Sequence, residues 1–405
     1  SDPVPTYGTH QQVEGVDASV LEEVGKFRSR LYVIGGSAHC TLGGEIARAH
    51  PGAVILHDVV LFELAGALAA SRSVNRKALP LEELTSRLHG HRVVSEMQVE
   101  KAMMPRAGTH PAISQRSHFL AYFLHSATVV LTHSEWASAR VQQAVAAPTL
   151  VARLPSELYG LKHSRDADQQ DPRTRHHIVI PGMVNRHKMV DVAIRAYARS
   201  RLRAQGHDLI ILGMCPPNFE AYLRLLARRE GVEDAVRFSS PASDGDFDAQ
   251  LASARAVVVL RESNTEAQSA ALLAALSSGS PVIASSGGCF GEVPSHLLES
   301  LPQEHTTEAL TAILDELDPD DPRVASRSEE ALAWVRETHA IGPYVEEVLR
   351  ALELHRKRVN AVASLLAGVN RLRFSGSHEI PGSAAALGHA FASLGLPFHP
   401  WDVGA

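Results

Sequence analysis

The fold of this chain is decided by residues 254–294, which read ARAVVVLRESNTEAQSAALLAALSSGSPVIASSGGCFGEVP. The apolar, β-branched run Ala256–Leu260 is typical of a buried parallel strand. The Ala- and Leu-rich segment Ala267–Ser278 predicts a helix that stops at Gly279. A second buried strand is expected over Val282–Ser285. Strand, helix and strand in this order predict a βαβ unit of an open α/β sheet.

The ends of these two strands carry residues suited to binding a ligand. Ligands of open α/β sheets bind beyond the carboxyl ends of the strands, where the N-terminus of the following helix attracts an anion. Arg261 and Glu266 follow the first strand, and Gly287 and Gly288 follow the second. Glycine allows the backbone to approach a ligand closely. We therefore predict a site for an anionic ligand at this edge of the sheet.

The same stretch resembles the donor-site signature of retaining glycosyltransferases with the GT-B fold. That family shows a Glu, seven residues, a second Glu, a G-x-P-V segment and a Gly-rich loop. Glu266, Gly279–Val282 and Gly287-Gly288 match it, but Ala274 stands in place of the second Glu. The resemblance implies that Glu266 contacts the donor sugar, while the family's usual contact to the ribose is missing. The stretch alone also fits an ordinary βαβ unit of another doubly wound protein.

Composition narrows the class of protein. A chain of 405 residues is expected to form about two or three domains, and its net charge of −6 gives no basic footprint for nucleic acid. No apolar run approaches the ~18 residues of a spanning helix, and the first residues lack a signal-peptide pattern. The three cysteines, Cys40, Cys215 and Cys289, are odd in number and far apart. They favour a reduced, cytoplasmic protein.

The first part of the chain shows the same α/β rhythm. Predicted strands end at a Gly-rich turn followed by His39, at His57-Asp58, and at His133. Residues 72–117 are predicted to form a helical insertion. The strand ends resemble the acceptor domain of a subset of GT-B transferases. This resemblance implies that His39, His57, Asp58 and His133 place the acceptor, although an isolated His is more often structural.

A second resemblance to the family lies where the second domain is expected to begin. A strand predicted over His176–Ile180 is followed by Gly182-x-x-Asn185-x-x-Lys188. This spacing is similar to a loop of the family, and it implies that Lys188 neutralises the donor diphosphate. The family's other loop form has an Arg where this chain has Met183, so Arg186 is expected to supply that charge. A lone Lys at a helix start would otherwise be an exposed surface residue.

The C-terminal residues 369–405 resemble the segment with which members of the family begin. After a helix predicted over Tyr344–Ala367, residues 369–374 are expected to form a strand, and a loop containing Gly376 follows. A small-residue helix and another strand complete a βαβ pattern that resembles the start of the family's acceptor domain. We therefore predict a circularly permuted chain. A tandem protein cut within a domain, or an added edge strand, are the alternatives.

These observations predict an α/β chain of GT-B type, with two Rossmann-like, doubly wound domains. Residues 1–172 plus 368–405 are expected to form the acceptor domain, 173–340 the donor domain, and 341–367 a crossover helix. The predicted activity moves a hexosyl group, with retention, from a nucleotide-diphosphate sugar to a small-molecule, glycan or lipid acceptor. Glu266, Lys188 and His57 are the expected catalytic residues.

The predicted site needs no cofactor, because the nucleotide sugar is a substrate, and no metal is expected. Asp244–Asp246 and Asp318–Asp321 are interpreted as turns and helix caps rather than metal ligands. Two other classes stay open: a GT-B-like scaffold that binds a nucleotide or partner without transfer, and a sugar epimerase or phosphorylase of the same fold. The absence of the second Glu favours the scaffold a little.

Overall fold

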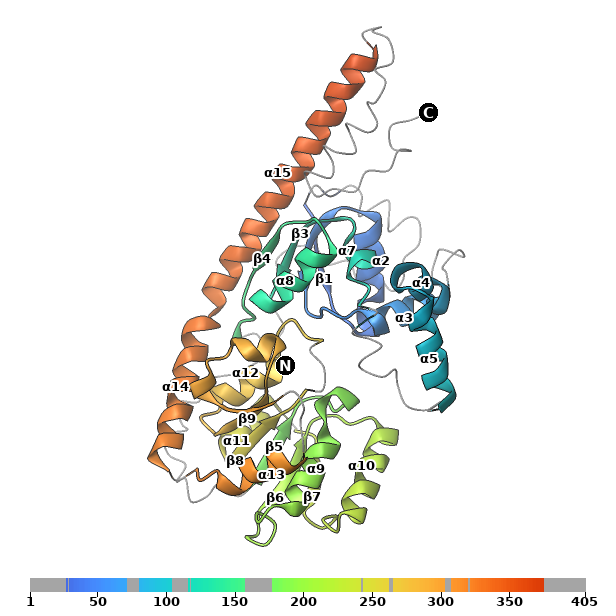
Figure 1. Cartoon of the computed structure of the whole chain (residues 1–405). Helices are drawn as coiled ribbons and strands as arrows, with labels where there is room; N and C mark the ends of the chain where they lie inside the picture. Colours follow the sequence, from blue (N-terminus) through green and yellow to red (C-terminus); the bar gives the residue numbers. More distant parts are fainter. Residues whose placement is uncertain are drawn as a thin grey trace. The chain divides into compact units, whose positions relative to one another are not determined.

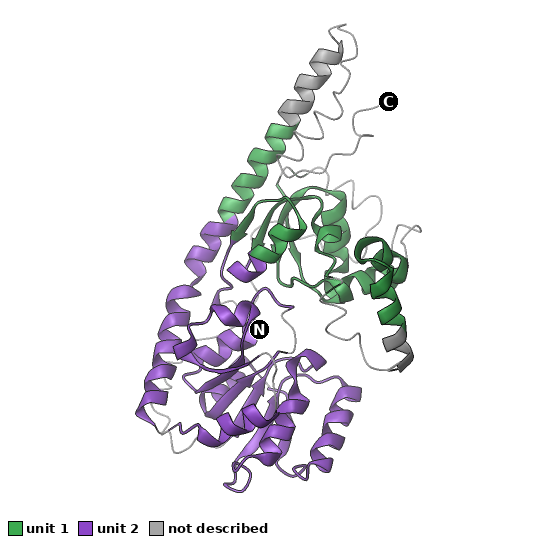
Figure 2. Cartoon of the chain, in the orientation of Figure 1, with its two compact units in different colours: residues 1–131, 139–150, 349–405 green, residues 132–138, 151–348 purple. Residues whose placement is uncertain are grey.

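Two parallel sheets organise the chain in the computed structural model (Figure 1). It describes residues 27, 29–70, 80–103, 116, 118–156, 177–241, 243–261, 265–302, 307–319 and 321–374. The chain divides into two compact units (Figure 2). Unit 1 comprises residues 1–131, 139–150 and 349–405, and unit 2 comprises residues 132–138 and 151–348. The domain boundaries expected from the sequence stay predictions.

Unit 1 contains a four-stranded sheet in the order β1-β2-β3-β4. Its pairs β1–β2 and β2–β3 are parallel. The short strand β4 was not expected. The elements are β1 (Leu31–Ile34), η1 (Ala38–Cys40), α2 (Thr41–Ala49), β2 (Gly52–Leu56), α3 (Phe62–Ala70), α4 (Leu81–His89), α5 (His91–Met103), α7 (Leu120–Leu124), β3 (Ala127–Thr132), α8 (Glu135–Ala144) and β4 (Thr149–Val151). Helices α4 and α5 lie within the predicted helical insertion.

Unit 2 contains a six-stranded sheet in the order β10-β9-β8-β5-β6-β7, and all of its neighbouring strands are parallel. Its first half comprises β5 (His177–Pro181), η5 (Arg186–Lys188), α9 (Val190–Arg199), β6 (Asp208–Leu212), α10 (Pro217–Arg229), β7 (Val236–Ser239) and α11 (Asp244–Ala252). Its second half comprises β8 (Ala254–Val259), α12 (Ala270–Ser277), β9 (Val282–Ser285), η6 (Gly288–Glu292), η7 (Ser295–Leu297), β10 (Glu299–Leu301), α13 (Thr307–Glu316) and α14 (Pro322–Thr338).

The sheet of unit 2 is buried on both faces. Successive residues of a strand point to opposite faces, so Ile178 and Ile180 of β5 join one core with α9, α10 and α13, while Val179 joins another with α11, α12 and α14. Both cores are apolar, which explains why the strands read as continuous Val- and Ile-rich runs rather than alternating ones.

The strand order of unit 2 contains a topological switch point. From β5 the chain proceeds to β6 and β7 on one side, and then returns to place β8, β9 and β10 on the other. The loops that follow β5 and β8 therefore leave the sheet edge in opposite directions, and a switch point of this kind is where open α/β sheets bind ligands. Lys188 follows β5, and Arg261 and Glu266 follow β8.

Helix α15 corrects two expectations about the tail. It runs over Ile341–Phe374 without a break, so residues 369–374 are helical rather than a strand, and Gly368 does not end the helix. One glycine in a helix interior costs only about 1 kcal/mol relative to alanine, and helix propagation is cooperative. The flanking Arg, Leu and Asn residues continue it. Gly376 and the rest of the expected βαβ unit lie outside the described residues.

The helix of the deciding stretch also begins later than expected. The Ser269 side chain caps α12 by accepting a hydrogen bond from the backbone N–H of Leu272, so the helix starts at Ala270 instead of Ala267. Residues 267–269 are buried ahead of it. Among the described residues, no helix has both the length and the apolar character needed to cross a membrane.

Candidate donor site

Glycine at position 182 allows the β5 loop to fold tightly against Lys188. Gly182 has a φ of 87°, in the left-handed region that favours glycine. A Cβ atom there would lie 2.5 Å from Lys188 Nζ. On its other side, Gly213 packs so closely that its own Cβ would lie 2.5 Å from the Gly182 carbonyl oxygen. The side chain of Lys188 is thus held against bare backbone.

Lys188 is a buried basic side chain of the site. Its residue exposure is only 6%, and Nζ donates a hydrogen bond to the Pro181 carbonyl oxygen at 2.6 Å. Burial, and to a smaller extent the nearby Arg261 guanidinium, lower the pKa of Lys188, while Glu266 opposes both; the resulting pKa is about 7. The following residue, Met189, has a φ of 50°, which is uncommon for a residue with a side chain. Lys188 thus lies beyond the carboxyl end of β5, and its role in binding a ligand stays a prediction.

Arg261 and Glu266 form an ion pair beside Lys188. The Nε of Arg261 donates to Glu266 Oε1 at 3.1 Å, and its Nη2 pairs with the same oxygen. The Arg261 backbone N–H donates to Ser285 Oγ at 2.7 Å, which ties the end of β8 to the end of β9. Glu266 Oε2 is buried and has no hydrogen-bond partner within the described part of the chain. One carboxylate oxygen therefore stays available to a ligand.

The remaining predicted donor residues follow the carboxyl ends of β5 and β9. Asn185 is exposed and Arg186 is half-buried, both at the start of η5. Gly287 and Gly288 follow β9 with φ values of 88° and 58°. Sequence reasoning missed Cys289, which is buried next in the chain; burial raises the pKa of its thiol. The positive φ values could have been expected from the Gly-Gly pair, but the role of Ser285 had no sequence signal.

Ala274 occupies the position at which the resembled signature has its second Glu. It is 5% exposed and packs in the apolar core that α12 shares with α14. This position offers no polar group to a ligand.

Three of the predicted acceptor residues come together in unit 1. The backbone N–H of Gly36 donates to Asp58 Oδ2 at 2.7 Å. A Cβ on Gly35 would lie 3.7 Å from His57 Cβ, so the glycine turn after β1 packs against the end of β2. Burial lowers the pKa of His57. His39 lies in η1, directly after this turn.

His133 stands apart from that group. It belongs to unit 2, is completely buried, and its Nδ1 lies 2.8 Å from the Ala152 carbonyl oxygen. Its neighbour Ser134 caps α8 and donates to the Ala267 carbonyl oxygen at 2.6 Å. These contacts favour a structural role for His133. Within the described ranges, no group of three potential metal ligands is present.

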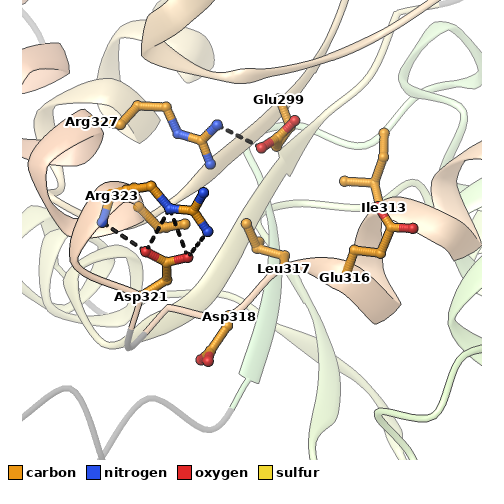
Figure 3. A pocket seen from close by; sticks show the side chains of 9 residues that line it. Glu299, Ile313, Glu316, Leu317, Asp318, Asp321, Arg323 and Arg327 are labelled. Atoms are coloured by element: carbon orange, nitrogen blue, oxygen red, sulfur yellow. Dashed lines mark hydrogen bonds and ion pairs between the residues drawn. The ribbon is translucent and has the colours of Figure 1, made fainter.

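A separate cavity of about 350 Å³ lies between β10, α13 and α14 (Figure 3). Arg327 pairs with Glu299 at 2.5 Å, and Arg323 pairs with Asp321, the residue that caps α14. Glu299 opens β10, so the cavity lies at the amino ends of the parallel strands. It is therefore not part of the site that holds Lys188.

Comparison with known proteins agrees with this geometry. Residues 164–331 match the family described as glycosyl transferases group 1, a range that includes Lys188, Arg261 and Glu266. No curated protein matches the chain in sequence.

Solved structures show the fold. HepE of Anabaena, in complex with UDP and glucose, is 15% identical with a TM-score of 0.54, covering 83% of this chain and 80% of its own. The pneumococcal O-GlcNAc transferase GtfA, in complex with UDP and GlcNAc, is 11% identical with a TM-score of 0.52, covering 83% and 59%. Sucrose-phosphate synthase of Thermosynechococcus elongatus is 15% identical with a TM-score of 0.50, covering 82% and 76%.

The fold class predicted from the sequence is confirmed: this is a GT-B-like α/β protein with two parallel sheets. The match of residues 164–331 to glycosyl transferases group 1 confirms the predicted enzyme class, a glycosyltransferase. The matched range lies in ordinary chain order, so the comparisons do not show the predicted circular permutation.

Proposed function

We propose that this protein transfers a hexosyl group from a uridine-diphosphate sugar to an acceptor hydroxyl, with retention of anomeric configuration. The observation that carries the proposal is the meeting of Lys188, Arg261 and Glu266 at the switch point of a group 1 domain. Uridine is the proposed base because HepE and GtfA, which share the fold, are described with UDP.

The two cations fit the leaving diphosphate. Transfer requires that the charge developing on the leaving phosphate be stabilised by groups already in place. Lys188 and Arg261 are both buried, so their interaction with phosphate oxygens is poorly screened by water. The unpartnered Oε2 of Glu266 can accept a hydrogen bond from a sugar hydroxyl. Asn185, Arg186, Gly182, Gly287 and Gly288 complete the proposed donor contacts.

The proposed reaction needs no additional protein base. The bond from the anomeric carbon to the acceptor oxygen forms as the bond to the phosphate oxygen breaks, and that phosphate oxygen takes the acceptor proton on the same face. His39, His57 and Asp58 are the proposed acceptor residues, with His57 placing the hydroxyl. The acceptor itself is a small molecule, a glycan or a lipid. Circular permutation is not part of this proposal, because the strand it required over 369–374 is helical.

The free thiols support a reducing, cytoplasmic setting. Cys40, Cys215 and Cys289 are all unpaired in the structure. Proteins that keep free cysteines are common in reducing compartments.

The test is the release of UDP from UDP-glucose and UDP-GlcNAc, with GDP-mannose and dTDP-glucose as comparison donors. Slow hydrolysis or transfer from a uridine donor is expected from the wild type and not from Lys188→Met. A protein that binds uridine donors but never releases the sugar would instead be a scaffold without transfer, which the buried Ala274 favours.

A further inference from the structure

The surroundings of Lys188 are unusual for a lysine that awaits an anion. An ammonium group has three N–H donors, and here its hydrogen bond goes to the Pro181 carbonyl oxygen. No carboxylate of the described residues lies within ion-pair distance of Nζ. The side chain is almost completely removed from water. A charged ammonium in this position would be poorly compensated.

The neighbouring charges do not compensate a positive charge on Lys188. Glu266 is the nearby carboxylate, but its Oε1 is held by two nitrogens of Arg261. Arg261 is itself a buried cation and stays charged at any ordinary pH. Two buried cations therefore share one carboxylate. Loss of the proton from Lys188 removes one of the two buried positive charges, whereas the guanidinium of Arg261 cannot lose its proton.

We propose that the donor diphosphate binds together with a proton, which Lys188 takes up from solvent. This inference rests on the proposed function. When the diphosphate enters, its negative charge supplies the missing partner, and the lone pair of Nζ accepts a proton to give an ammonium group paired with phosphate. When the nucleoside diphosphate leaves, the proton is released again.

The coupling sets how donor binding depends on pH. In the protein without donor the pKa of Lys188 is about 7, so above that pH the side chain is largely neutral. Donor binding must then include the protonation of Lys188. The affinity for the donor should therefore decrease above this pKa, approaching about a tenfold decrease per pH unit. The diphosphate of a nucleotide sugar has no group of its own that titrates in this range.

Calorimetry of UDP-glucose binding tests the proposal directly. Binding is measured at about pH 8 in HEPES and in Tris, whose ionisation enthalpies differ, so that the difference in observed heat counts the protons taken up. We expect uptake approaching about one proton, and a dissociation constant that rises about tenfold for each unit of pH above the pKa.

Variants identify the group that takes the proton. His187 precedes Lys188 in η5, and histidine is the other residue type there that can take up a proton, so His187→Gln is the matched control and should keep the uptake. Lys188→Met should bind weakly at every pH, without uptake, and thermal unfolding will show that it is folded. UDP-glucose binding with no proton uptake and a constant affinity overturns the inference and leaves the proposed function intact. Failure of every nucleotide sugar to bind overturns both.

Discussion

At the scale of single residues, the site depends on how three charges share a buried space. Arg261 and Glu266 carry one positive and one negative charge, Lys188 adds a second positive charge only when it is protonated, and each is held by backbone or by another member of the group. A change at one of them should therefore alter the others, and their effects should not add.

Replacing Glu266 by Gln removes the charge with little change in shape. Turnover should fall by roughly 100-fold or more, because the ion pair with Arg261 and the contact to the donor sugar are both weakened. Glu262, four positions earlier, is the matched control, and Glu262→Gln should keep near wild-type kcat. Steady-state release of UDP measures both. If Glu262 proves the more sensitive position, the assignment of Glu266 is wrong.

Gly182→Ala should displace Lys188. The new Cβ would lie 2.5 Å from Nζ and would also strain a backbone with a φ of 87°. Gly206→Ala is the matched control, because its φ is 83° but no atom lies within 4 Å of the added Cβ. Both changes should cost about 1 kcal/mol of stability, but only Gly182→Ala should weaken donor binding markedly. Equal donor affinities in a calorimetric titration would contradict this geometry.

The buried Lys188 should also make the free energy of unfolding depend on pH. Because burial lowers the pKa of Lys188 from 10.5 to about 7, the unfolded chain binds more protons between these values, and stability rises with pH across that window. Lys188→Met lacks this contribution, so the wild type should gain on the variant by at most about 1.4 kcal/mol per pH unit. Urea denaturation at about pH 7 and pH 9 measures it. Parallel pH dependence in the two proteins would contradict the lowered pKa of Lys188.

At the scale of elements, α15 is the clearest departure from what the sequence pattern indicated. A strand was expected over 369–374, but a long helix continues through Gly368. Short apolar runs do not distinguish a strand from a helix, and the cost of one glycine is small when both flanks are helical.

Gly368→Ala tests the helical interior. It should raise the free energy of unfolding of the intact chain by up to about 1 kcal/mol, because alanine is the better helix former. Gly368→Pro should instead lower helix content, since proline removes a hydrogen bond within the helix. Far-UV circular dichroism and thermal unfolding measure the two. A stabilising Gly368→Pro would show that the helix ends where the sequence pattern indicated.

At the scale of the whole molecule, ligand binding should be visible as stability. Unit 2 holds the proposed donor contacts, so a uridine nucleotide that binds the folded protein should stabilise it by about 2.7 kcal/mol at 100 times its Kd. A thermal-shift comparison of UDP with GDP and dTDP should show the larger shift for UDP. Equal shifts for all three would mean that the site reads the diphosphate and not the base.

Local patterns in the sequence were sufficient to predict the α/β class, most strands of both sheets and the positions of Gly182, Lys188 and Glu266 near strand ends. Strand propensity, glycine turns and residue spacing act over a few positions, so they can be recognised without a structure. The pairing of Arg261 with Glu266 beside a buried Lys188 was not predictable in this way. It arises because β8 returns to lie next to β5, far earlier in the chain, and burial and charge compensation are properties of that packing. The same reason explains why β4 and the burial of His133 were decided only in three dimensions.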